Sequence, residues 1–191
     1  MISNALEFLL QTILGLFTLA VLLRFYLQLT GAPFKNPASQ TVVVLTNFAV
    51  RPLRRIIPGW GGLDFATLFL AYIAQFLLQL GTMWLRDFPL LVAGNSIWIA
   101  LFGLALIGLL KLSIYIFLYA VLLQAILSWV NPYTPITPVL DALTKPLLKP
   151  LRKHMPATGG IDFSPLVVFI GAELLLILVI TPLEQQFLRF F

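Results

Sequence analysis

The stretch RPLRRIIPGWGGLDF, residues 51–65, decides the fold because the chain contains it twice. Its second copy, KPLRKHMPATGGIDF, occupies residues 149–163, so the two copies are offset by 98 positions in a chain of 191 residues. Eight positions are identical, four more keep their chemistry, and the alignment needs no gap. The repetition predicts a tandem duplication, with one repeat over residues 1–95 and the other over residues 96–191.

The composition is that of a membrane protein. The chain is 60% hydrophobic, its mean hydropathy is +1.01, and 10% of its residues are charged, whereas ordinary soluble domains carry roughly 25% charged residues. Several apolar runs reach the length of about 20 residues that crosses a bilayer. These runs are continuous and do not alternate, so they predict helices and not the strands of a barrel. The first run lacks a positively charged start and is interpreted as a retained span, not a cleaved signal.

Four spans are predicted, at about residues 6–29, 65–85, 96–130 and 163–181. The third leaves two alternatives open, because residues 88–130 carry one charge, Lys111, and could form two spans or one long helix with an irregular start. Capping residues favour a helix start near Ser96. The fourth span is expected to close before Pro182.

The distribution of basic residues predicts the topology. Of the twelve lysine and arginine residues, four lie within residues 31–62 and four within residues 131–160. Positive charge in short loops marks the cytoplasmic side, so both loops are expected there, with two crossings between them. The expected fold is an all-α membrane protein of four transmembrane helices, built as two parallel two-span repeats, each with an amphipathic basic cytoplasmic loop. The expected location is the bacterial inner membrane, with both termini periplasmic.

Each basic loop is expected to begin with an amphipathic helix that lies at the membrane interface. In the second repeat, Thr137 and Pro138 are expected to start this helix as its N-cap and first residue. Prolines at positions 52, 146 and 150 are expected to break or kink the two helices.

Each loop ends in the pattern P-x-x-G-G-(L/I)-D-F, which predicts a tight turn followed by a helix cap. Asp64 and Asp162 are the expected caps of the second and fourth spans, where a carboxylate suits the positive helix end. In the second repeat, Ser164 followed by Pro165 is an alternative cap and first helical residue. Two interpretations stay open: a surface anchor with a turn and a cap, or a docking or ion-sensing surface. The residues of this candidate docking and lipid-facing loop are Arg51, Arg54, Arg55, Asp64, Lys149, Arg152, Lys153 and Asp162.

A second candidate site lies within the spans, because an ionisable group at that depth is costly and usually marks function or a buried pair. Glu173 is predicted midway along the fourth span, and its repeat partner is Gln75. Gln79 and Gln124 complete the candidate intramembrane site. Four roles stay open for Glu173: a hydrogen-bonded neutral acid, a dimer contact, a proton or cation relay, or a salt bridge.

Two further charges interrupt the spans. Lys111 is not expected to be level with Glu173 and is interpreted as extending outward to the interface. Arg24 is interpreted as extending inward, or as reaching Asp64 or Asp162.

The residue inventory argues against an enzyme. The chain has no cysteine and one histidine, His154, which is interpreted as a polar loop residue. The lack of cysteine excludes disulfides, thiol catalysis and cysteine-ligated metals. No Ser-His-Asp set, metal-spaced cluster or phosphate loop is recognised, so no catalytic residue, metal or cofactor is expected.

The paired phrases resemble the mark of the YggT (YlmG) family of bacterial and plastid membrane proteins. That mark is a two-span unit with a Pro-Leu-Arg-Arg…Pro…Gly-Gly-(Ile/Leu)-Asp-(Phe/Ser) loop, present here in residues 52–65 and 150–163, with Lys153 in place of the second arginine. Asn36-Pro37 and the stretch from Ser128 to Pro132 also fit. The resemblance implies a role in osmotic or salt tolerance with potassium uptake, in cell division and nucleoid distribution, or in cytochrome b6f maturation in plastids. The last is the least transferable to a chain with one histidine.

Two functions therefore stay open. One is a non-enzymatic scaffold whose basic loops grip the inner leaflet and dock a cytoplasmic or division protein. The other is osmotic and ion homeostasis, as a small oligomeric channel or a modulator of transport. The expected partners are a bilayer with an anionic inner leaflet, further copies of the chain, and a cytoplasmic protein. Nucleic acid is not expected, because anionic lipid accounts for the net charge of +5.

Overall fold

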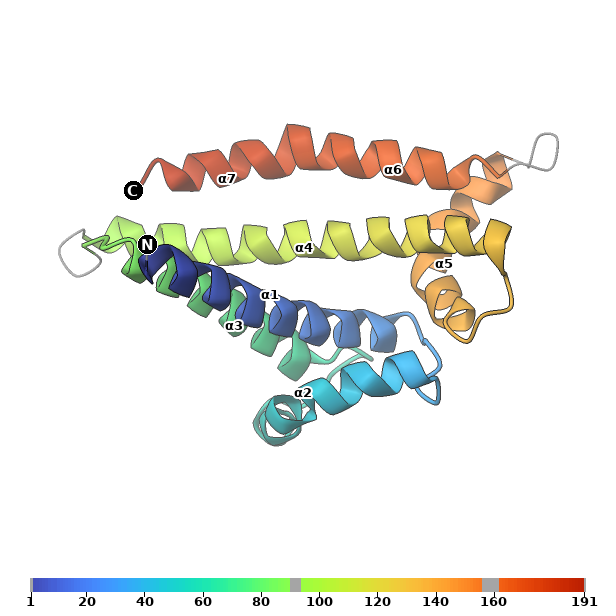
Figure 1. The fold of residues 1–191 in the computed structure, drawn as a ribbon, viewed down its shortest axis with the longest axis horizontal. Coiled ribbons are helices and arrows are strands. Elements are labelled where there is room, and N and C mark those ends of the chain that lie inside the picture. Colours follow the sequence, from blue (N-terminus) through green and yellow to red (C-terminus); the bar gives the residue numbers. More distant parts are fainter. Residues whose placement is uncertain (1, 90–93, 156–161, 191) are drawn as a thin grey trace.

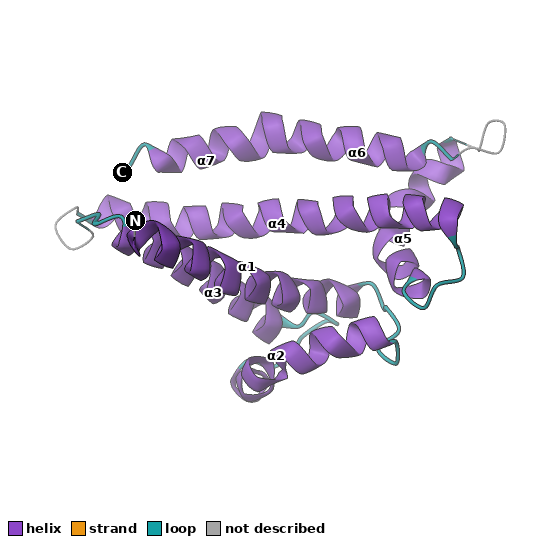
Figure 2. Ribbon diagram, in the orientation of Figure 1, coloured by secondary structure: helices purple, strands orange, loops and turns teal. Residues whose placement is uncertain are grey.

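The computed structural model describes residues 2–89, 94–155 and 162–190, which form helices joined by short turns (Figure 2). Within these residues four helical stretches are long and apolar enough to cross a membrane: α1 (Ile2–Leu29), α3 (Phe65–Leu85), α4 (Asn95–Val130) and a composite helix over Ser164–Leu188. Two amphipathic helices, α2 (Pro37–Ile56) and α5 (Thr137–His154), connect the spans within each half. The predicted all-α class with four spans is confirmed.

The two halves run in parallel. In Figure 1, α1 and α4 run in one direction, and α3 and the composite fourth helix return in the other. Both α2 and α5 therefore lie at the same end of the bundle, and the described ends of the chain lie at the opposite end (Figure 1). This arrangement places both copies of the basic loop on one side, as the even-span repeat requires.

The third span is a single helix. α4 has 36 residues and is therefore about 54 Å long, longer than the roughly 30 Å hydrocarbon core of a bilayer. It begins at Asn95, one residue before the expected start, so residues 95–110 belong to it. Residues 90–93, which were part of the uncertain segment, lie outside the described residues.

The fourth span was expected to close before Pro182, but the helix continues past this residue to Leu188. It comprises α6 (Ser164–Leu175), a π-helical turn (Leu176–Ile180) and α7 (Thr181–Leu188). Within the wide turn, the Thr181 amide bonds the Leu176 carbonyl five residues back. A proline cannot donate to the usual carbonyl, and we attribute the wide turn to the space that the Pro182 ring requires.

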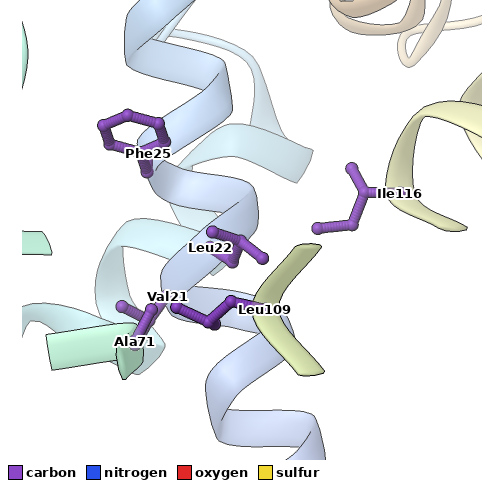
Figure 3. Close-up of a cluster of buried hydrophobic side chains, with 6 residues drawn as sticks. All are labelled: Val21, Leu22, Phe25, Ala71, Leu109 and Ile116. Carbon is purple, nitrogen blue, oxygen red and sulfur yellow. The ribbon is translucent and has the colours of Figure 1, made fainter. Parts of the chain in front are cut away.

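The apolar core lies between α1, α3 and α4. Figure 3 shows Val21, Leu22 and Phe25 of α1 beside Ala71 of α3, and side chains of α4 complete the cluster. The composite fourth helix is packed less closely. A small cluster joins it to α4 in its second half, whereas the only buried residue of α6 among those described is Ser164. The first repeat is thus closed and the second is more open.

Both amphipathic helices continue through their prolines, so of the two expected outcomes, a break or a kink, the break does not occur. α2 contains Pro52, and α5 contains Pro146 and Pro150. In Figure 1 the first turns of α2 lie across the view and its last turns are seen end-on, which shows that the helix bends. The expected cap of α5 is also wrong by one residue: the N-cap is Ile136, and Thr137 is the first helical residue.

Candidate functional site

An Arg–Asp clamp joins the end of α2 to the start of α3. Arg54 donates from Nε to the Asp64 carboxylate at 3.0 Å, and its Nη2 also contacts this carboxylate. Asp64 is the N-cap of α3, where it accepts the backbone N–H of Thr67 at 3.2 Å and contacts the Thr67 hydroxyl. One carboxylate thus caps the span and holds the amphipathic helix. The cap was predicted from the sequence, whereas the bond between Arg54 and Asp64 was not.

The environment of Asp64 favours its charged form. Burial raises the pKa of this carboxyl, but hydrogen bonds from Arg54 and Thr67 lower the pKa by more, so it lies below the ordinary value of 3.8. Asp64 is 4% exposed. Its carboxylate is therefore committed to the clamp and is not available to a lipid or a partner.

The second repeat builds an Arg–Asp pair with the same ten-residue spacing, but the expected cap is wrong there: the N-cap of α6 is Phe163, one residue after Asp162. Arg152 donates from Nε to Asp162 at 2.8 Å, and Asp162 accepts the backbone N–H of Ser164 at 2.9 Å. Burial raises the pKa of the Asp162 carboxyl, while bonds from Ser164 and Arg152 lower the pKa by more, so it too lies below 3.8. This copy is more exposed, with 35% of the Asp162 side chain accessible against 3% for Asp64.

A glycine turn sets the reach of the first clamp. Gly61 and Gly62 have φ angles of 61° and 83°, which favour glycine over other residues. Trp60 and Leu63 close the turn with two backbone hydrogen bonds of 3.1 and 3.0 Å. The predicted tight turn is therefore confirmed in the first repeat. The equivalent residues 156–161 lie outside the described residues.

A second contact joins each amphipathic helix to the first span of its repeat, which is α1 for α2 and α4 for α5. Arg24 of α1 donates from Nη1 to the Thr46 hydroxyl at 2.8 Å and to the Asn47 side-chain oxygen at 3.0 Å. Arg24 is 4% exposed and Thr46 is fully buried. Arg24 thus bonds α2, and not Asp64 or Asp162 as expected, and it does not extend to solvent.

The matching contact in the second repeat uses Gln124. Its side-chain oxygen accepts from the buried Thr144 hydroxyl, and its amide nitrogen contacts Asp141, both on α5. Gln124 therefore belongs with the amphipathic helix and not with Glu173. The sequence held a signal for this pair: AVLLR at residues 20–24 recurs as AVLLQ at residues 120–124, offset by 100 positions.

The two repeats differ in one contact. In the first, Arg54 also donates from Nη2 to Gln28 of α1 at 2.9 Å, so that three helices meet at its guanidinium. In the second, Arg152 has no hydrogen bond to α4 within the described parts of the chain. A groove of about 690 Å³ lies there between α4, α5 and α6.

Four cations near the clamps stay exposed. Arg51 and Arg55 flank the first clamp arginine, and Lys149 and Lys153 flank the second. No hydrogen bond or ion pair holds any of these four side chains within residues 2–89, 94–155 and 162–190. The repeated phrase therefore divides its basic residues into two that are paired with an aspartate, Arg54 and Arg152, and four that are free.

The structure does not gather the intramembrane polar candidates into one site. Gln75 is buried against α4, where a Cβ on Gly108 would lie 2.2 Å from its side-chain nitrogen. Gln79 lines a separate pocket towards the opposite end of the bundle, with Arg86. Glu173 is partly exposed, and its side chain has no hydrogen bond or ion pair to any described residue.

Two ion pairs at the opposite end were not foreseen. Lys111 pairs with Glu184 of α7 at 2.8 Å, so it does not simply extend outward. Glu184 was not considered as a partner, because it lies beyond the predicted end of the fourth span at residue 181. Arg86 pairs with Glu7 of α1 at 2.6 Å. Both pairs join consecutive spans of one repeat.

Metal-binding groups are sparse. No group of three or more histidine, cysteine or acidic residues that could hold a metal ion occurs within the described residues. His154 makes a local contact, with its Nδ1 2.8 Å from the Pro150 carbonyl oxygen.

The CCB3/YggT family model matches the chain in two segments, residues 3–85 and 103–183. The chain belongs to the CCB3/YggT family. An uncharacterized protein of Pseudomonas aeruginosa is 39% identical over 187 residues, which cover 97% of this chain and 93% of that protein. The uncharacterized protein YggT of Escherichia coli strain K12 is 41% identical over 166 residues, covering 86% and 84%.

A further uncharacterized relative, from Vibrio alginolyticus, is 38% identical over 174 residues, covering 89% of this chain and 90% of that protein. No solved structure matches the chain. The two family segments each contain one amphipathic helix and its Arg–Asp clamp, so the family signature and the repeated device coincide. The resemblance inferred from the loop phrases is confirmed.

Proposed function

We propose that this protein is a non-enzymatic scaffold of the bacterial inner membrane that presents two basic amphipathic helices at the cytoplasmic face. α2 and α5 rest on anionic lipid and together form a docking surface for a cytoplasmic or division protein. The physiological setting is envelope organisation with osmotic and potassium homeostasis. Both termini lie in the periplasm, since short loops rich in lysine and arginine stay in the cytoplasm and the termini lie at the opposite end of the spans.

One observation supports the proposal. In each copy of the repeated phrase one arginine is bound to an aspartate, whereas the basic residues that flank this arginine stay free. A helix held only by lipid would not need Arg54 bonded to a buried aspartate. The clamp fixes the direction of the exposed cations relative to the spans. Each cation near an anionic leaflet contributes about 1 kcal/mol, so four of them give a substantial attraction for lipid headgroups or an acidic partner.

The experiment is complementation of a deletion strain under osmotic shock and potassium limitation. The test variant changes the four free cations to glutamine, at Arg51, Arg55, Lys149 and Lys153. Its matched control exchanges the same positions between lysine and arginine, which keeps the charge. We expect the glutamine variant to insert normally and fail to complement, while the control complements. Full complementation by both variants would overturn the docking role.

A second candidate is a small oligomeric ion channel or transport modulator, and Glu173 is the observation that favours it. This carboxyl lies in the fourth span without a partner among the described residues, a few residues before the π-helical turn. Four spans are few for a pore within one chain, so this function requires several copies. Loss of complementation by Glu173→Gln, with the cation variant unaffected, would favour it.

A further inference from the structure

The groove in the second repeat has one polar end and one apolar end. Its apolar walls come from α4 and from the first turns of α6, including Leu122, Leu166 and Phe169. These three side chains are among the exposed large hydrophobic residues of the chain. Its polar rim lies where both helices meet α5, at the end of the bundle that carries the clamps.

The rim carries charges of both signs. Arg152 contributes a guanidinium whose Nε is occupied by Asp162 and whose two terminal nitrogens have no acceptor among the described residues. Asp141 contributes a carboxylate in which one oxygen contacts Gln124 and the other has no donor in the described parts of the chain. The groove is therefore lined by free donors and a free acceptor, which lie eleven residues apart along α5, together with an apolar slot.

The first repeat shows what fills this space when the device is closed. There Gln28 of α1 bonds the clamp arginine, and α1 and α3 pack together around the core. The residue that corresponds to Gln28 by the 100-position offset is Ser128, whose hydroxyl bonds the Ala125 carbonyl of its own helix instead. The second repeat thus keeps the clamp and lacks the side chain that closes it.

We propose that this groove binds one phospholipid of the cytoplasmic leaflet that carries a primary amine, of the ethanolamine class. The lipid phosphate accepts hydrogen bonds from the terminal nitrogens of Arg152, and its ammonium donates to Asp141. One acyl chain lies in the slot between Leu122 and Phe169. The lipid thereby replaces the contact that Gln28 makes in the first repeat.

The charges select this headgroup. Among the charged residues that line the groove, Arg152 is paired with Asp162 and Asp141 remains as an unpaired negative charge, which disfavours a lipid whose head is only anionic. A choline head carries no N–H and cannot donate to Asp141, whereas an ethanolamine ammonium has three donors. The site differs from the four free cations, which attract anionic lipid without a groove. The two proposals can therefore fail independently.

The test is native mass spectrometry of the full-length protein after exchange into detergent with equal amounts of ethanolamine, choline and glycerol phospholipids of identical chains. We expect one ethanolamine lipid to be retained at about tenfold higher occupancy than the others, since a hydrogen bond to a charged group changes binding by about this factor. Asp141→Asn should remove the preference. Asp87→Asn, the same change at the opposite end of the bundle, should leave it intact.

A second pair of variants tests the slot without changing charge. Ala125→Phe places a ring in the groove and should lower lipid retention to background, while Leu174→Phe, on an exposed face of α6, should not. Equal retention of all three lipids, a preference for the glycerol lipid, or retention that survives both Asp141→Asn and Ala125→Phe would overturn the proposal. A lipid-free dimer as the sole species would also overturn it, because a second copy would then cover the groove.

Discussion

Arg54 donates to Asp64 across ten residues of sequence and thereby joins the last turn of α2 to the first turn of α3. The same bond recurs between Arg152 and Asp162. A duplicated loop that only needed to turn would require its glycines and its cap, but not the arginine. The recurrence of Pro-Leu-Arg is explained by this clamp, which fixes each amphipathic helix against the spans of its own repeat.

The two clamps should differ in their contribution to stability. Asp64→Asn removes a buried charged cap from under a guanidinium, and we expect it to lower the free energy of unfolding by about 1–3 kcal/mol. Asp162→Asn acts at a more exposed pair and should cost clearly less. Thermal unfolding in detergent measures both. Equal losses would contradict the difference in burial between the two repeats.

Acid should remove the contribution of Asp64. Its folded pKa is lowered relative to the ordinary value of 3.8, so its stabilisation is fully present above that value and is lost as pH falls through the lower, folded pKa. The difference in unfolding temperature between wild type and Asp64→Asn should therefore be constant near neutral pH and shrink below about pH 4. A difference that narrows already between pH 7 and pH 6 would point to another titrating group.

The close approach of α3 and α4 should depend on Gly108. A methyl group there would meet the Gln75 side chain at 2.2 Å, and overpacking of this kind costs about 1–3 kcal/mol. Gly108→Ala should destabilise the protein, and Gln75→Ala in the same chain should recover most of the loss. A double-mutant cycle in unfolding experiments gives the coupling. Additive effects would mean that the two residues do not meet.

The Lys111–Glu184 pair should behave as a unit. Lys111→Met leaves Glu184 without its partner and Glu184→Gln does the reverse, so each single change should destabilise the protein more than the double change Lys111→Met/Glu184→Met. Unfolding temperatures of the three variants rank them. If the double variant were the least stable of the three, the pair would have no special role.

Much of the fold could be predicted from the sequence, because the apolar runs fix the spans and the duplicated loop fixes their parity. The limits were local. Pro52, Pro146 and Pro150 remain inside helices, since a helix at an interface can bend and hydrate the freed carbonyls. The fourth helix continues past Pro182 through a π-helical turn, which no simple sequence pattern indicates. Glu184, the partner of Lys111, lies in this continuation and was therefore not predicted.

The candidate site was predicted in part. The cap role of Asp64 followed from its place before an apolar run. The pairing of Arg24 with Thr46 did not, because a charge in a span suggests an opposite charge as its partner, whereas here a buried hydroxyl group takes that place. The repeated AVLL phrase could have indicated it, but its 100-position offset differs from the 98 of the loop, so an ungapped comparison misses it. The groove was not predictable because it is open where the second repeat lacks the contact that Gln28 makes with Arg54 in the first.

The central claim is that the parallel repeats hold both basic helices at the cytoplasmic face, and labelling of single cysteines tests it most directly. The natural chain has no cysteine, so one cysteine at position 55, 87 or 153 gives an unambiguous signal with a membrane-impermeant thiol reagent. In intact cells the account predicts labelling of Asp87→Cys alone, and in inside-out vesicles labelling of Arg55→Cys and Lys153→Cys. Labelling of positions 55 and 153 from opposite sides of the membrane would contradict it.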